Sequence, residues 1–228
     1  MKAPLGFGDR TIPVPSHVCL FYYDDTELRS RFGFLKIGLE APDEAVVLFG
    51  RAERLDQVKA YLASDLGRDL AADHDSGKLV FVGGDRDPDV LLGGIGSALD
   101  RLAKRGTKLI RFMGFIGWGD PSWPSDIELL KFEAAVNGAA AKFPVIVVCA
   151  YNVVELPGPI LMTGGVATHP YTVVGATLCE NPHYVTTTDY LTRLEDVDSP
   201  RWFAGVTVGP LSTRAERATP RGDAAGRG

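Results

Sequence analysis

The sequence predicts an α/β domain with a mostly parallel sheet that helices cover on both faces. Short, continuously apolar runs alternate along the chain with segments whose apolar residues recur every three or four positions, as in repeated βαβ units. The apolar runs lack the polar alternation of a sheet with one wet face, so both faces are expected to be covered. The length of 228 residues suits one α/β domain better than two.

The first elements follow a segment, residues 1–15, that we expect to be an extended N-terminal arm. The run HVCLFYY at 17–23 predicts a buried strand. Asp24 or Asp25 can cap the helix that comes next, and Pro42 ends it. The apolar face of this helix is made by Leu28, Phe32, Leu35 and Leu39.

Two further strands are predicted at 45–50 (AVVLFG) and 78–84 (KLVFVGG), with a helix over 55–66 between them. Asp87-Pro88 then opens a helix that continues to about Lys104. This order repeats the strand–helix alternation and supports right-handed parallel crossovers.

The run at 107–119 contains a fourth strand, and 144–152 (PVIVVCAYN) is the fifth. Between them, Ser125 and Glu128 have the spacing of a capping box and predict a helix start. A short, glycine-interrupted helix is expected over 156–170.

The last strand is predicted at 171–178. We expect one domain over residues 16–211, followed by a disordered tail at 212–228, because that tail is rich in Gly, Ala and Arg without periodicity.

Composition narrows the classes of function. A net charge of −5 lacks the basic excess typical of direct nucleic-acid binding. No apolar stretch approaches the ~18–20 residues that span a bilayer, and the proline-containing start does not resemble a secretory signal. Three widely spaced cysteines, Cys19, Cys149 and Cys179, do not form a disulfide framework. We therefore expect a cytoplasmic protein without nucleic-acid or membrane partners.

Common catalytic and cofactor motifs are missing. There is no GxxxxGK[ST] loop, no HExxH and no GxSxG, and the GGIGS at 93–97 lies within a predicted helix instead of between a strand and a helix. His17, Cys149 and His169 have side chains that suit a borderline metal, but their spacing supports no metal site. The sequence thus predicts no cofactor and no metal.

Aromatic and polar side chains gather where predicted strands end. Ligands of open parallel sheets bind beyond the carboxyl ends of the strands, and a mostly apolar pocket with a few polar anchors suits a small organic molecule. The residues expected at this rim include Tyr22, Trp118, Cys149, Tyr151 and His169.

Some of these residues also have a purely structural interpretation. Free cysteine commonly packs as a small hydrophobic residue, and His17 at a strand start is commonly a hydrogen-bonded core histidine. Glu133 lies at helical spacing beside Leu129, Leu130 and Val136 on an apolar face, so its carboxylate needs a partner there.

Five strings between about residues 16 and 185 resemble a known family. They are HVCLFYYDDTELRSRFGFLKIGL, RFMGFIGW, ELLKFEAAVN, VCAYN and THPYTVVGATLCENPHYV. In this order they are similar to the MEDS domain, a methanogen/methylotroph sensory domain. The resemblance implies a three-layer RecA- or KaiC-like fold without a phosphate-binding loop. It also implies a sensor of small hydrocarbon derivatives that signals to a partner regulatory protein, such as a kinase, an anti-sigma factor or a transcription factor.

The resemblance also transfers residues to this chain. The positions that match the family's motifs are His17, Phe21, Tyr22, Arg111, Gly114, Trp118, Glu133, Cys149, Tyr151, His169, Pro170, Asn181, Pro182 and Tyr184. Phe115 and Asn152 stand where family members commonly have acids, which makes the expected site less anionic and more apolar.

Three functions are consistent with these observations. The first is a non-catalytic sensory domain in which Tyr22, Trp118, Tyr151 and Tyr184 surround a small apolar molecule. In this hypothesis His17, Glu133 and His169 anchor the molecule, and Cys149 lines the floor of the site. The second is a degenerate nucleotide-binding or ATPase-like domain. The third is an enzyme that uses Cys149 with His169 as thiolate and base.

Overall fold

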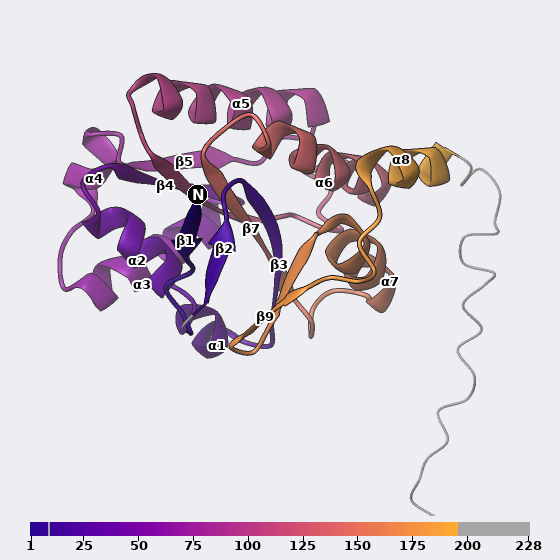
Figure 1. The fold of residues 1–228 in the computed structure, drawn as a ribbon, viewed down its shortest axis with the longest axis horizontal. Helices are drawn as coiled ribbons and strands as arrows, with labels where there is room; N and C mark the ends of the chain where they lie inside the picture. The colour runs from indigo at the N-terminus through magenta and orange to yellow at the C-terminus, as the bar shows by residue number, and fades with distance from the viewer. Residues whose placement is uncertain (9, 196–228) are drawn as a thin grey trace, which may run out of the picture. The chain divides into compact units, whose positions relative to one another are not determined.

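A seven-stranded sheet with the spatial order β5-β4-β6-β7-β3-β8-β9 organises the fold (Figure 1). In the computed structural model, residues 1–8 and 10–195 are described. The strands are β3 (Ser16–Tyr22), β4 (Glu44–Gly50), β5 (Leu79–Gly83), β6 (Leu109–Phe115), β7 (Val145–Asn152), β8 (Tyr171–Val174) and β9 (Thr177–Glu180). All neighbouring strands pair in parallel except β8 and β9.

Helices cover both faces, which confirms the fold class predicted from the sequence. On one face, α1 (Asp25–Arg29), α2 (Gly33–Glu40) and α3 (Ala52–Leu66) pack into one apolar core. On the other, α5 (Pro88–Lys104) and α6 (Asp126–Ala140) pack into a second core. Figure 1 shows α5 on the opposite side of the sheet from α2 and α3. The remaining short elements are α4 (Ala71–Asp75), α7 (Gly158–Ile160), the π-helical turn η1 (Leu161–Val166) and α8 (Thr187–Glu195).

The N-terminal segment packs on the domain. β1 (Lys2–Pro4) and β2 (Thr11–Pro13) pair antiparallel, and Leu5 is fully buried. Arg111 of β6, also fully buried, donates to the Pro4 carbonyl at 2.8 Å and pairs with Glu44 at 2.5 Å. Arg111, which matches the family's arginine, therefore ties β1 to the seven-stranded sheet.

The helix predicted after the first strand is divided into α1 and α2. Its predicted apolar face is buried, and Asp24 caps α1 by accepting a hydrogen bond from the Glu27 amide. The division falls where the N-terminal segment crosses: a Cβ on Gly33 would lie 1.9 Å from the Gly6 carbonyl oxygen. Only glycine permits this close backbone approach.

The last predicted strand is a hairpin. The prediction of one strand over 171–178 is wrong because Gly175, with a φ of +56°, turns the chain between β8 and β9. The capping box of Ser125 and Glu128 at the start of α6 is confirmed. The predicted domain end at 211 and the tail predicted over 212–228 lie outside the described residues.

None of the described helices is long and apolar enough to cross a membrane.

Candidate functional site

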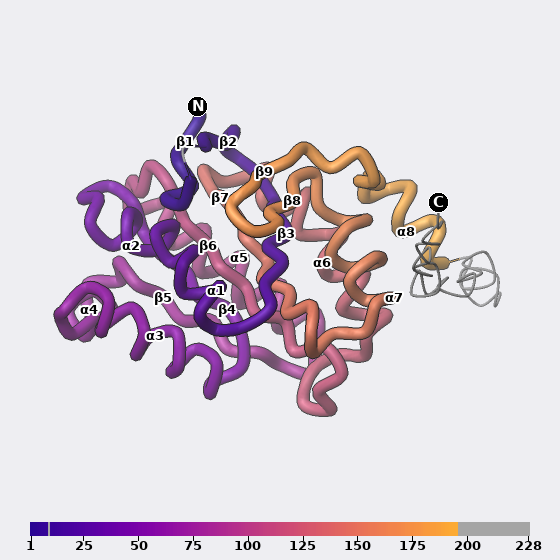
Figure 2. The backbone as a smooth tube through the Cα atoms, turned by 90° about the horizontal axis from the view of Figure 1, so that it is seen from below, coloured from indigo at the N-terminus to yellow at the C-terminus, as the bar shows by residue number. Residues whose placement is uncertain are grey.

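Four of the predicted site residues converge in the core. His17 (β3), Glu133 (α6), Cys149 (β7) and His169 (after η1) present one ligand atom each, and these atoms all lie within 4.8 Å of one another. We call them the buried tetrad, because each residue is at most 3% exposed. Topology explains the meeting: β3 lies between β7 and β8 in the sheet, α6 contacts both β3 and η1, and Figure 2 shows α6 beside β3.

His17 is held by its neighbours in one tautomer. The Asn137 side chain donates from Nδ2 to the Thr168 carbonyl at 2.8 Å, so its Oδ1 faces His17 Nδ1 at 3.2 Å as an acceptor. His17 Nδ1 therefore carries the proton. The unprotonated Nε2 lies 3.3 Å from Cys149 Sγ and 3.4 Å from Glu133 Oε2.

His169 is oriented in the same way. Its Nδ1 lies 2.8 Å from the Gly165 carbonyl oxygen, which can only accept, so Nδ1 carries the proton. Its Nε2 has no hydrogen-bond partner among the described residues and lies 3.8 Å from Glu133 Oε2. The His169 ring lies against the His17 ring with centroids 3.9 Å apart and planes tilted by 40°, and the Tyr151 ring meets it edge-on with centroids 5.8 Å apart.

Glu133 is the acidic centre of the tetrad. Tyr151 donates its hydroxyl to Oε1 at 2.5 Å, and Cys149 Sγ lies 3.6 Å from Oε2. Tyr151 is therefore the hydrogen-bond partner that the buried Glu133 carboxylate was predicted to need. Burial raises the pKa of Glu133, against the opposing influence of His169 and Tyr151.

Burial also disfavours charge on the other members. It lowers the pKa of His17 to about 3 and that of His169 to about 3. It raises the pKa of the Cys149 thiol, with a further contribution from Glu133. Both imidazoles are thus neutral at pH 7, so the close histidine–glutamate contacts are not ion pairs.

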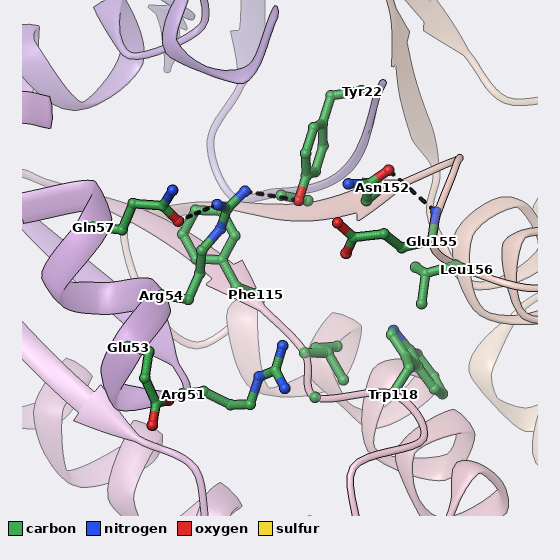
Figure 3. Close-up of a pocket in the computed structure, with 13 residues that line it drawn as sticks. Tyr22, Arg51, Glu53, Arg54, Gln57, Phe115, Trp118, Asn152, Glu155 and Leu156 are labelled. Atoms are coloured by element: carbon green, nitrogen blue, oxygen red, sulfur yellow. Dashed lines mark hydrogen bonds between the residues drawn. The ribbon is translucent and has the colours of Figure 1, made fainter. Parts of the chain in front are cut away.

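A second feature is a cleft of about 520 Å³ at the carboxyl ends of the strands. Figure 3 shows the residues that line it. Tyr22 and Trp118 are predicted site residues, and Asn152 is a departure from the family pattern. Arg51 and Arg54 come from the start of α3. Arg54 donates to the Tyr22 hydroxyl at 3.0 Å. We call this the strand-end cleft, and its lining mixes both charges with aromatic rings.

The two arginines of the cleft already have anionic partners. Arg51 pairs with Asp120 at 3.0 Å, and Arg54 pairs with Asp25 at 2.7 Å. Sequence reasoning missed them because it applied the strand-end rule to the first, fourth and fifth strands only. The same rule applied to 45–50 points directly to Arg51.

A third feature is a cavity of about 50 Å³ between α5, α6 and the sheet, which we call the interhelical cavity. Every residue that lines it is apolar, glycine or cysteine. Its walls include Leu92, Ile95 and Leu99 of α5, Phe132, Val136 and Ala139 of α6, and Phe112, Val147 and Cys149 of the strands. Cys149 therefore faces both the cavity and the tetrad.

The remaining predicted residues contribute no ligand atom to the tetrad. Asn181 donates from Nδ2 to the Val166 carbonyl at 2.5 Å and to the His169 carbonyl at 2.7 Å, so it fixes the segment that carries His169. Trp118 lines the cleft, and its ring centroid lies 6.2 Å from that of Tyr151. Tyr184 is not among the residues that line the cleft or the interhelical cavity.

The departures from the family pattern have local roles. Asn152 Oδ1 accepts from the Val154 amide at 3.0 Å and so stabilises the turn after β7. Phe115 lines the cleft, where the Arg54 guanidinium lies 5.4 Å from its ring centroid.

Comparisons with known proteins agree with this fold. A search of the solved structures finds a KaiC-like protein from the hyperthermophilic archaeon Pyrococcus horikoshii, with a TM-score of 0.52 and 14% sequence identity. The match covers 75% of this chain and 79% of that chain, and it confirms the KaiC-like architecture. No curated protein sequence matches the chain significantly.

The profile of one protein family matches the sequence. It is the MEDS family, described as the methanogen/methylotroph, DcmR sensory domain, and the match covers residues 16–170. This confirms the resemblance over residues 16–170, which contain four of the five strings and the start of the fifth, and the family's description supports a sensory role. Because the match spans more than half of the 228 residues, the chain belongs to the MEDS family.

Proposed function

We propose that this chain is a cytoplasmic, non-catalytic sensory domain that binds a small apolar organic molecule in the interhelical cavity and signals to a separate regulatory protein. The observation that carries the proposal is the wholly apolar lining of that cavity, with Cys149 as its one heteroatom-bearing wall. A molecule that offers no hydrogen bonds suits such a lining, because no polar group in the wall is left without a partner.

The volume of the cavity limits the ligand. An engineered apolar cavity of about 150 Å³ takes up benzene. The interhelical cavity, at about 50 Å³, is a third of that size. It suits molecules with one or two carbons, such as halomethanes or short hydrocarbons, and excludes aromatic rings unless the helices separate.

Helix α5 is suited to respond to such a ligand. It contains Gly93, Gly94 and Gly96, and Gly96 lines the cavity. Each glycine within a helix costs about 0.5–1 kcal/mol relative to alanine, so this half of α5 is held mainly by its packing on the sheet and α6. A ligand between α5 and α6 favours whichever helix position fits it, and that shift is the proposed signal.

The nucleotide alternative has little support in the geometry. In the segment after β3, where a phosphate-binding loop would lie, Asp24 caps α1 and Asp25 pairs with Arg54. Carboxylates at this helix start repel phosphate instead of attracting it.

The enzyme alternative is also disfavoured. Cys149 lies close to a histidine, but that histidine is His17, at 3.3 Å. Both side chains are buried, and the raised pKa of the Cys149 thiol opposes thiolate formation. The tetrad therefore lacks an activated nucleophile.

The test titrates a solution of the full chain with chloromethane, dichloromethane, ethane and benzene, each supplied as a vapour. The readouts are melting temperature and tryptophan fluorescence, since Trp123 packs 5.4 Å from Phe49 of the cavity wall. We expect saturable responses to the one- and two-carbon compounds but none to benzene.

The variant Ala139→Leu fills the cavity and should abolish the response. Ala141→Leu, at an exposed position on the end of the same helix, serves as the matched control and should respond like the original chain. A response that survives unchanged in Ala139→Leu, or no response in the original chain, refutes the proposed site.

A further inference from the structure

The buried tetrad has the donor set of a tetrahedral transition-metal site, and we propose that His17 Nε2, His169 Nε2, Cys149 Sγ and one Glu133 oxygen bind a single divalent ion of the zinc class. This inference is independent of the proposed organic ligand. The argument rests on donor spacing, on the tautomers of the two imidazoles, on an unpartnered nitrogen and on charge.

The spacing of the donor atoms is close to that of a zinc tetrahedron. Zinc bonds of about 2.0–2.2 Å to nitrogen or oxygen and about 2.3 Å to sulfur place neighbouring ligands about 3.3–3.6 Å apart. In the tetrad, His17 Nε2 lies 3.3 Å from Cys149 Sγ and 3.4 Å from Glu133 Oε2, and Cys149 Sγ lies 3.6 Å from the same oxygen. The fourth donor, His169 Nε2, lies 3.8 Å from Glu133 Oε2, and all four donor atoms lie within 4.8 Å of one another, so His169 has to move closer to complete the tetrahedron.

Both imidazoles present an unprotonated Nε2 to the same carboxylate oxygen, Glu133 Oε2. Each Nδ1–H is held by an oxygen acceptor, Asn137 Oδ1 for His17 and the Gly165 carbonyl for His169. Metal-bound histidines almost always have this arrangement, because the outer hydrogen bond fixes the tautomer and the ring orientation. Tyr151 does the same for the carboxylate by donating to its outer oxygen, Oε1.

One donor atom has no hydrogen-bond partner among the described residues. His169 Nε2 is fully buried and accepts no hydrogen bond from the described residues. An unpaired buried nitrogen costs about 1–3 kcal/mol, and a metal bond removes that cost.

The charge and the chemical type of the donors identify the class of ion. A thiolate, a carboxylate and two neutral imidazoles carry a charge of about −2, which a divalent cation cancels. Nitrogen, sulfur and oxygen together favour a borderline ion such as Zn²⁺ or Co²⁺ over Mg²⁺ or Ca²⁺. Four protein ligands without an open position are typical of a structural site, and binding releases the thiol proton to solvent.

The test uses the full chain without a histidine tag, produced in medium supplemented with Zn²⁺ or Co²⁺. Because the tetrad is buried, the ion is expected to bind as the chain folds. Elemental analysis should give about one ion per chain. The Co²⁺ form should show the visible absorption of a tetrahedral ion and a thiolate-to-metal band in the near ultraviolet. X-ray absorption of the Zn²⁺ form should show one sulfur at about 2.3 Å with nitrogen or oxygen at about 2.0–2.2 Å.

Variants separate this site from adventitious binding. Cys149→Ser should abolish the thiolate band, while Cys179→Ser, which changes an exposed thiol, should retain it. Asn137→Ala removes the outer hydrogen bond of His17, together with the hydrogen bond that Asn137 donates to the Thr168 carbonyl, and should weaken metal affinity about 10–100-fold. A protein that folds without bound metal in both media, or a Co²⁺ form that lacks the thiolate band, overturns the proposal without bearing on the cavity ligand.

Discussion

Replacing Tyr151 with phenylalanine removes one hydrogen bond from the tetrad and keeps the aromatic ring. The hydroxyl donates to Glu133 Oε1 at 2.5 Å, and the two residues are 1% and 0% exposed. Water therefore cannot replace the lost donor. Because phenylalanine has nearly the same volume, the change isolates the hydrogen bond from the effects of packing.

The expected loss follows from the burial of both partners. A hydrogen bond to a charged group contributes about 1.5–3 kcal/mol, and a neutral one about 0.5–1.5 kcal/mol. We expect Tyr151→Phe to lower the free energy of unfolding by about 1–3 kcal/mol. For a domain of this size, each kcal/mol corresponds to about 2–4 °C in melting temperature.

The assay is urea unfolding followed by circular dichroism, with Tyr23→Phe as the control. Tyr23 is 65% exposed, so its variant should match the original chain within about 0.5 kcal/mol. A double-mutant cycle with Glu133→Gln measures the coupling between the two side chains. A loss for Tyr151→Phe no larger than that of Tyr23→Phe would show that the hydroxyl does not stabilise the buried carboxylate.

Three further predictions concern the scaffold and are measured by the same unfolding assay. Arg111→Met breaks a buried ion pair and should cost about 3 kcal/mol, and a loss below about 1 kcal/mol would contradict its role in tying the first strand to the sheet. Gly33→Ala should destabilise the domain, because the added Cβ would lie 1.9 Å from a backbone oxygen. Gly93→Ala, whose Cβ would have nothing within 4 Å, should stabilise the domain by about 0.5–1 kcal/mol. Equal effects of the two variants would refute the close approach at Gly33. Ser125→Ala should cost about 1 kcal/mol by removing the capping box, and no change would contradict that role.

Periodicity predicted much of the scaffold correctly. The apolar runs became the parallel strands, and helical spacing placed Glu133 on a buried face with a required partner. These successes depend on local patterns, which the sequence contains directly. The small α4 and α8 helices and the hairpin after β8 were missed because short elements depend on single turns and on tertiary contacts.

The site was only partly predictable. The residues of the tetrad were expected to line one ligand site at the strand ends, and they lie together in the core. Their four segments are far apart in the sequence, so no local spacing indicates a shared ligand. The interhelical cavity depends on how α5 and α6 pack over the strands, and of its lining residues only Cys149 was predicted from the sequence as a site residue. Packing gaps of this kind arise from the fit of side-chain volumes, which residue patterns do not specify.

The most direct test of the sensory account locates a bound molecule. Carbon-13-labelled dichloromethane should give nuclear Overhauser contacts to the methyl groups of Val136, Ala139 and Leu99 in the full chain, and these contacts should disappear in Ala139→Leu. Contacts confined to the strand-end cleft, or none at saturating ligand, would contradict the account.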